Sequence, residues 1–237
     1  MPTHREFSEV FGTNLSARSR TAKGVSDTST SRQKKPLLKT GGALKAQVEE
    51  NTERLIEEVW QNSRLAISPL NLELFANRWY DIINFELQDP EVYKKEHREI
   101  ILRVPDSQLG RANPRFRLWN AEYTTLNLSP EEIPTAMDDF YRDFSARLNT
   151  ARLNAASNRE DGRQESLLAY ADHMIDSAIH PWLDGCGRWA TALVMYASIA
   201  VVGFRLPRFG TREEHYANIG NLERHTDYFA LCLNRET

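Results

Sequence analysis

Apolar residues recur at spacings of three and four positions along most of the chain, which is the pattern of helices that bury one face. Serine followed by proline marks two helix starts, Ser68-Pro69 and Ser129-Pro130, because serine caps a first turn and proline suits its first position. The pattern predicts helices over residues 43–64, 69–87 and 90–101, from residue 129 through Phe144, and over 167–178, 190–201 and 213–233. A polar loop is predicted at 154–163.

The interval 103–129 differs from the rest of the chain because the helical spacing is lost there. Two short runs in it, Phe116–Asn120 and Tyr123–Leu128, are rich in strand-forming residues and alternate in part between apolar and polar positions. The sequence therefore predicts a mostly α-helical fold with one short β-element, between Arg115 and Leu128, before the central helix pair.

Residues 1–43 have a different composition from the rest. They are rich in Ser, Thr, Arg and Lys and poor in large aliphatic side chains, so they are predicted to be disordered, ahead of one domain at 44–237. Two interpretations stay open: a solvated tail, or an export signal that directs the protein into a host cell. The apolar region of a secretory signal peptide is absent from this segment.

Charge and cysteine content narrow the classes of function. A net charge of −3 argues against a general nucleic-acid binder. No apolar run reaches the roughly eighteen residues of a membrane span, so no membrane partner is expected. The two cysteines, Cys186 and Cys232, do not make a disulfide framework, which favours a reducing, cytoplasmic location.

The segment with the most chemistry lies between the helices predicted at 167–178 and 190–201. It reads His180-Pro-Trp-Leu-Asp-Gly-Cys-Gly-Arg188. Gly185 and Gly187 bracket a tight turn at the start of the second helix, where backbone N–H groups form an anion site. Arg188 falls in the first helical turn, where the helix dipole disfavours a cation unless an anion lies nearby. The segment therefore predicts a phosphate site.

This segment resembles the motif of the Fic (filamentation induced by cAMP) family, His-Pro-Phe-x-Asp-Gly-Asn-Gly-Arg-x-x-Arg. The resemblance implies a Fic-like helical domain that transfers AMP from ATP, or a group from a related nucleotide donor, to a Ser, Thr or Tyr hydroxyl of a target protein. In the family, the β-element is a flap hairpin that docks the target segment as an added strand, so the resemblance implies a β-hairpin flap here. Trp182 replaces the family's Phe, and the matching residues are His180, Pro181, Asp184, Gly185, Gly187 and Arg188.

The resemblance also implies a role for each motif residue. His180 would be the general base, since an imidazole titrates near neutral pH. Asp184 would bind Mg²⁺, or Mn²⁺, as a hard carboxylate ligand. Arg188 would hold a phosphate oxygen. The nucleotide phosphates would lie against the backbone of Gly185, Cys186 and Gly187.

Two positions depart from the family motif: Cys186 replaces Asn, and Thr191 replaces the second Arg. If these changes only weaken a nucleotide site, Cys186→Asn with Thr191→Arg is predicted to restore ATP affinity. The alternative is a degenerate Fic-like protein that binds nucleotide or a partner without catalysis. A toxin held by a separate antitoxin chain, or a homo-oligomer, also stays open. Zinc at Cys186 would need further Cys or His ligands at short spacing, which the sequence lacks.

Overall fold

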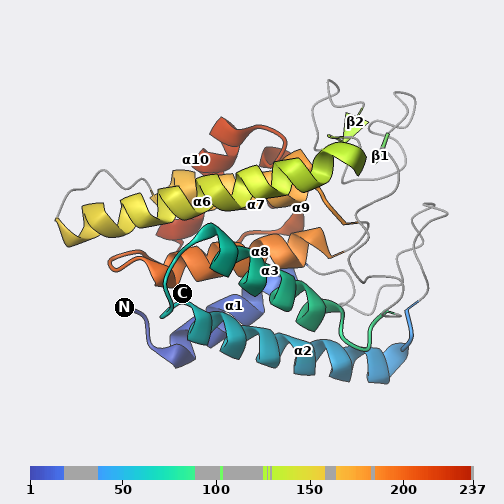
Figure 1. Ribbon diagram of the computed structural model, residues 1–237. Coiled ribbons are helices and arrows are strands. Elements are labelled where there is room, and N and C mark those ends of the chain that lie inside the picture. Colours follow the sequence, from blue (N-terminus) through green and yellow to red (C-terminus); the bar gives the residue numbers. More distant parts are fainter. Residues whose placement is uncertain are drawn as a thin grey trace.

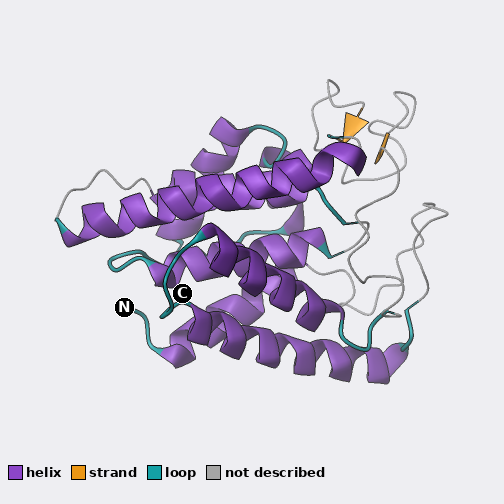
Figure 2. Ribbon diagram, viewed as in Figure 1, coloured by secondary structure: helices purple, strands orange, loops and turns teal. Residues whose placement is uncertain are grey.

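The computed structural model describes residues 1–18, 37–88, 102–103, 125–126, 128, 130–157, 164–182 and 185–235. Helices dominate this part of the chain, as Figure 2 shows, and the mostly α-helical class is confirmed. The helices, labelled in Figure 1, are α1 (His4–Arg18), α2 (Gly41–Asn62), α3 (Pro69–Asn84), α6 (Ile133–Ala156), α7 (Gln164–His173), α8 (Cys186–Ala200), α9 (Arg212–Asn218) and α10 (Leu222–Asn234).

Several predicted helices lie close to where the spacing of apolar residues placed them. The predictions at 43–64 and 69–87 correspond to α2 and α3, and Ser68 caps α3 by accepting a hydrogen bond from the N–H of Asn71. A 3₁₀ turn, η3 (Pro130–Glu132), leads into α6. The helix predicted at 213–233 is divided into α9 and α10, because Asn221 caps a new helix there. The prediction at 90–101 lies outside the described residues.

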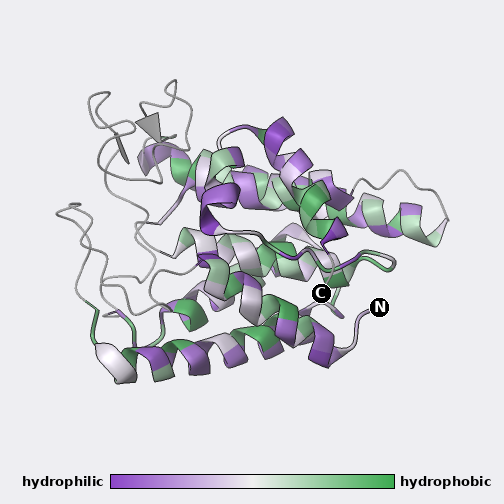
Figure 3. Cartoon of the chain, turned by 180° about the vertical axis from the view of Figure 1, so that it is seen from behind, coloured by the Kyte–Doolittle hydropathy of each residue, from purple (hydrophilic) through white to green (hydrophobic). Residues whose placement is uncertain are grey.

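Helix α8 lies at the centre of the fold, where α1, α2, α3 and α7 pack against it. Every residue from Trp189 to Ala200 is buried. The buried hydroxyls of Thr191 and Ser198 in α8 bond to backbone carbonyls one turn earlier in the helix, which satisfies them without a partner from outside. The outer helices carry hydrophilic residues beside hydrophobic ones, as Figure 3 shows for α2. None of the described helices is long and apolar enough to cross a membrane.

The prediction that residues 1–43 are disordered is wrong for the first part of the segment. Residues 4–18 form α1, whose apolar face packs against α2 and α8. That face carries the helical spacing of three and four, but the polar composition of the longer segment hid it. Residues 19–36 lie outside the described part of the chain. The buried apolar residues of α1 are Phe7, Val10, Phe11 and Leu15.

The β-hairpin flap predicted between Arg115 and Leu128 is also wrong. The only strands in the described residues are two residues long, β1 (Leu102–Arg103) and β2 (Thr125–Leu126), and they pair antiparallel with Leu102 opposite Leu126. β1 lies outside the predicted interval, and the residues between the two strands are not described. Partial alternation over five or six residues does not specify a hairpin, because strand preference depends on the packing of both faces.

Candidate functional site

The motif loop, residues 180–188, begins where α7 changes its winding. From Met174 to Ile179 the chain continues as a π-helix, η4, and His180 then adopts a left-handed conformation with φ of 47° and ψ of 61°. Gly185, with φ of 85°, directly precedes α8. π-helical turns and left-handed residues other than glycine are both found preferentially at functional sites. The backbone thus singles out His180 independently of the motif.

His180 is held as one tautomer. Its ring Nδ1 lies 3.0 Å from the backbone carbonyl oxygen of Asp176. A carbonyl oxygen only accepts hydrogen bonds, so Nδ1 donates and the lone pair of the neutral ring is on Nε2. That is the form in which an imidazole acts as a general base. The residue is nevertheless buried, with 5% of its surface exposed.

Helix α3 covers the start of α8. Tyr80 of α3 stacks on Trp182, with ring centroids 4.8 Å apart. A Cβ atom on Gly185 would lie 3.2 Å from the Tyr80 ring, so the close packing and the positive φ both require glycine. The Cys186 thiol is buried and donates to the carbonyl of Trp182 at 3.3 Å. At this helix start Gly185 and Cys186 are therefore buried, whereas Gly187 and Arg188 are partly exposed.

Of the predicted site residues that the structure describes, Arg188 lines a cavity. The cavity has a volume of about 390 Å³ and lies between α1, α2 and the end of α3. Arg188 Nη1 donates to the carbonyl of Ile83 at 3.3 Å, which holds the side chain at the wall. The charged lining residues besides Arg188 are Lys45, Glu49 and Glu53. The uncharged ones are Gly12, Leu15, Ser16, Val48, Asn51, Thr52, Leu55, Ile83 and Leu87.

The structure bears differently on two other positions of the motif, Asp184 and Thr191. Asp184, the predicted metal ligand, lies outside the described residues. Thr191, where the family has its second Arg, is fully buried in α8, and its hydroxyl donates to the carbonyl of Gly187 at 2.8 Å. An arginine there would place a charged group in the core. We therefore expect Thr191→Arg to destabilise the fold and not to restore a phosphate contact.

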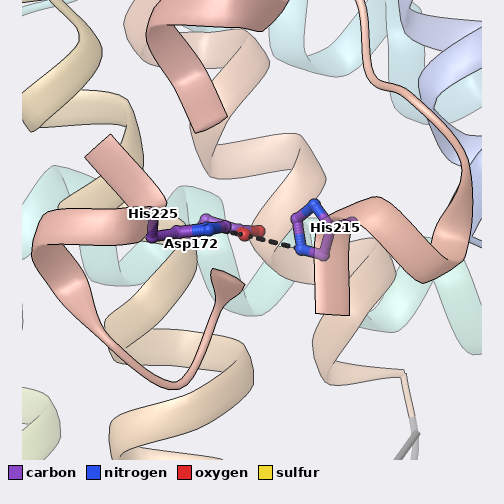
Figure 4. A group of neighbouring side chains, drawn as sticks. All are labelled: Asp172, His215 and His225. Atoms are coloured by element: carbon purple, nitrogen blue, oxygen red, sulfur yellow. Dashed lines mark hydrogen bonds and ion pairs between the residues drawn. The ribbon is translucent and has the colours of Figure 1, made fainter. Parts of the chain in front are cut away.

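A buried cluster of charged groups lies beside the motif loop. Arg18, at the end of α1, donates from Nη1 to Asp172 Oδ1 at 2.7 Å and from Nη2 to Asp176 Oδ2 at 2.8 Å. On the other side of Asp172, His225 Nε2 lies 2.7 Å and His215 Nε2 2.9 Å from Oδ2, as Figure 4 shows. These five buried residues are called the Asp172 cluster below.

The Asp172 cluster and the motif loop share Asp176. The Asp176 carboxylate binds Arg18, and its backbone carbonyl accepts the hydrogen bond from His180. Gly187 adds a second contact, since a Cβ atom there would lie 3.3 Å from Arg18 Nη2 and 3.3 Å from the Tyr216 hydroxyl. The end of α1 is therefore packed directly against the turn that carries the motif.

Burial and mutual attraction determine the ionisation of the cluster. Burial is the largest single influence on Arg18 and opposes its charge, but Asp172, Tyr216 and Asp176 together outweigh it and raise the pKa of the guanidinium. Burial is also the largest single influence on Asp172 and opposes its ionisation, but Arg18, His215 and His225 together hold the pKa of that carboxyl well below its usual range. Burial, followed by the charge of Arg18, lowers the pKa of His215 to about 4. The pair of Arg18 and Asp172 is thus ionised at neutral pH, and His215 is neutral.

No protein-family model, curated protein or solved structure matches the chain. The resemblance to the Fic family therefore rests on the motif residues. The sequence prediction did not include the Asp172 cluster, because its members lie far apart in the chain and Arg18 belongs to a segment predicted to be disordered. The sequence does contain one signal for this region, the apolar spacing within residues 4–18. That spacing indicates the helix but not the charged contact that Arg18 makes at its end.

Proposed function

We propose that this chain is a Fic-like transferase that moves AMP from ATP to a Ser, Thr or Tyr hydroxyl of a target protein. The observation that carries the proposal is the state of His180. Its Nδ1–H is bonded to the Asp176 carbonyl, so the basic lone pair is on Nε2, in a strained residue at a helix–loop–helix junction. This junction also carries the two glycines and the arginine of a phosphate site.

In the proposed reaction, the target hydroxyl gives its proton to His180 Nε2 as its oxygen attacks the α-phosphorus of ATP. A new P–O bond to the protein forms, the bond between the α-phosphorus and the bridging oxygen breaks, and pyrophosphate leaves. Backbone N–H groups at the start of α8 would stabilise charge on the phosphate oxygens. Mg²⁺ or Mn²⁺, bound through Asp184, would neutralise charge on the phosphates.

The cavity beside Arg188 is the proposed place for the nucleotide. Its volume of about 390 Å³ is in the range of small-molecule sites, roughly 300–1,000 Å³. On its wall Arg188 is placed to contact a phosphate, and Leu15, Leu55 and Leu87 supply an apolar surface for a base. The second cation, Lys45, lies 3.7 Å from Glu49, and Glu49 and Glu53 balance the two cations of the wall, so the fit to a nucleotide depends on Arg188 and the apolar surface.

A second candidate function is nucleotide binding without catalysis. It is favoured by the closed geometry at the start of α8, where His180 and Cys186 are both buried and α3 packs over the loop. A target hydroxyl would reach His180 only after this part of the molecule opens. Binding to Arg188 from the cavity does not require that opening.

The experiment incubates the full-length protein with a cell lysate, Mg²⁺ and ATP labelled on either the α- or the γ-phosphate. Transfer of AMP labels a target protein from α-labelled ATP and not from γ-labelled ATP. We expect His180→Ala to abolish the labelling, with a loss of about 10² to 10⁴ in rate, and His173→Gln to keep it. His173 is a suitable control because it lies on the same helix and its Nδ1 bonds to the carbonyl of Ile219.

A calorimetric titration with Mg²⁺-ATP on the same proteins distinguishes the two candidates. Binding that is lost in Arg188→Ala, without labelling of any target, supports the non-catalytic function. Labelling that survives in His180→Ala contradicts the proposed base. If the wild-type protein shows no binding of Mg²⁺-ATP and no labelling of a target, both candidate functions are contradicted.

A further inference from the structure

We propose that Asp172, His215 and His225 form a buried binding site for a divalent transition metal, with zinc as the best fit. This site is independent of the proposed transferase function. Its three ligand atoms, one carboxylate oxygen and two imidazole nitrogens, lie within 4.8 Å of one another. Figure 4 shows Asp172 between the two histidines, with both rings directed at its carboxylate.

The first argument is the convergence of two histidines on one oxygen. His225 Nε2 lies 2.7 Å and His215 Nε2 2.9 Å from Asp172 Oδ2. His225 forms a hydrogen bond with it, whereas His215 approaches closely without the alignment of one. Nδ1 of His215 has no hydrogen-bond partner among the described residues, and Nε2 has the close but poorly aligned contact with Oδ2. A poorly aligned contact at a buried imidazole stabilises little, and a metal bond at Nε2 would replace it.

The second argument is charge. Around Asp172 the structure buries two carboxylates, Asp172 and Asp176, against the single guanidinium of Arg18. If His215, His225 and His180, whose Nδ1 lies 3.8 Å from Asp176 Oδ1, are all neutral, one negative charge is in excess in a place without solvent, which is unfavourable. A divalent cation between His215, His225 and Oδ2 changes that excess to one positive charge, which a hydroxide as the fourth ligand would balance. The competing solution is a proton on one of the histidines, and the experiment below separates the two.

The third argument is the surrounding structure. Arg18 binds Asp172 through Oδ1, which fixes the carboxylate and leaves Oδ2 directed at the histidines. Such a contact, made behind a metal ligand, orients the ligand. Aromatic rings enclose the other side: Tyr228 is stacked on His225 with centroids 5.6 Å apart, and Phe209 contacts His215 at 5.6 Å.

The ligand set favours zinc. Two imidazoles and one carboxylate are typical zinc ligands, and an all-oxygen set would be expected for Mg²⁺ or Ca²⁺. Zinc bonds of about 2.0–2.2 Å keep neighbouring ligand atoms roughly 3.3 Å apart, so the histidine nitrogens need to move outward by about 0.5 Å. The described residues offer three ligands, and a water molecule, or the hydroxide formed from it, would be the fourth ligand. Because the ligands come from α7, α9 and α10, the metal would join the C-terminal helices to the core.

The test begins with the wild-type chain, purified without chelator and without a histidine tag. We expect elemental analysis to find about one zinc per chain. The site is buried, so the exchange experiment uses unfolding in denaturant with a chelator, followed by refolding with or without Zn²⁺. Refolding with free Zn²⁺ at about 100 times its Kd should raise the melting temperature by roughly 5–10 °C. Refolding with Co²⁺ should give the visible absorption of a cobalt ion bound to nitrogen and oxygen.

Three variants locate the metal. His215→Gln and His225→Gln should each lose the zinc and the zinc-dependent rise in melting temperature. His173→Gln, one residue from Asp172 and outside the ligand set, should keep both. If a ligand variant does not fold, the zinc content and cobalt spectrum of the wild type still decide the question. A folded wild type that holds no zinc and melts at the same temperature with and without Zn²⁺ overturns the proposal, and a proton then balances the charge. Equal zinc content in His225→Gln and wild type also overturns it.

Discussion

The motif loop and the Asp172 cluster lie against each other, but their side chains are held in different ways. In the motif loop, His180, Cys186 and Arg188 each bond to a backbone carbonyl of a nearby helix or turn. In the Asp172 cluster, charged and polar side chains contact one another across five different elements. Removing a side chain from the loop leaves a carbonyl without one partner. Removing one from the cluster leaves a buried charge unpaired, which is far more destabilising.

The largest effect is expected from the removal of Arg18. Arg18→Met keeps much of the side-chain volume but leaves the carboxylates of Asp172 and Asp176 buried without their cation. We expect a loss of about 3–5 kcal/mol in the free energy of unfolding, measured by denaturant titration. The control is Arg5→Met, on the exposed side of the same helix, where a solvated ion pair contributes little and the free energy of unfolding should stay nearly unchanged. If Arg18→Met and Arg5→Met lower the free energy of unfolding by the same small amount, the Asp172 cluster does not stabilise the fold more than the motif loop does.

The second effect is on the pH dependence of stability. Burial, followed by the charge of Arg18, lowers the pKa of His215 to about 4, from an ordinary value of 6.5. Between these two values the unfolded chain binds a proton that the folded chain does not, so stability falls as the pH decreases from about 6.5 to 4. The contribution of this one group is roughly 3 kcal/mol over the whole window. Unfolding titrations at several pH values, with chelator present, should show this slope in the wild type and a smaller slope in His215→Gln.

A third and smaller effect tests the contact between the two regions. Gly187→Ala places a methyl group 3.3 Å from Arg18 Nη2, which two carboxylates hold in place. We expect a loss of about 1–2 kcal/mol. Gly12→Ala is the matched control, since nothing lies within 4 Å of its added Cβ. Alanine there should raise the free energy of unfolding by about 0.5–1 kcal/mol through helix propensity. The two glycine variants should thus shift the melting temperature in opposite directions.

The smallest effect on stability is expected at His180. His180→Ala removes the hydrogen bond to the Asp176 carbonyl, but the strained backbone at φ of 47° stays. We expect a change within about 1 kcal/mol in the free energy of unfolding, while transfer of AMP is lost. His180→Gly adds a second measurement, since glycine relieves that strain and should be at least as stable as alanine. A loss as large as that of Arg18→Met would place His180 among the residues that hold the fold together.

The amino-acid sequence by itself determined the features that depend on neighbouring residues. The spacing of apolar residues placed α2, α3 and the core helix α8, because each helix must bury one face or all of it. The turn before α8 was also predictable at Gly185, which takes a positive φ, whereas Gly187 lies inside the helix. The β-hairpin was not predicted correctly, because strand pairing depends on partners that a short alternating run does not specify.

Only the tertiary structure decided which distant side chains meet. Arg18, Asp172, His215 and His225 come together because α1 and α7 pack against α8, α10 packs against α7 and α9 packs against α10, and no local pattern encodes that contact. The same packing buried His180 and enclosed the start of α8 under Tyr80, which the motif alone did not indicate. A local pattern of residues determines backbone conformation and the chemistry a segment carries. Solvent exposure and the pairing of buried charges depend on long-range packing.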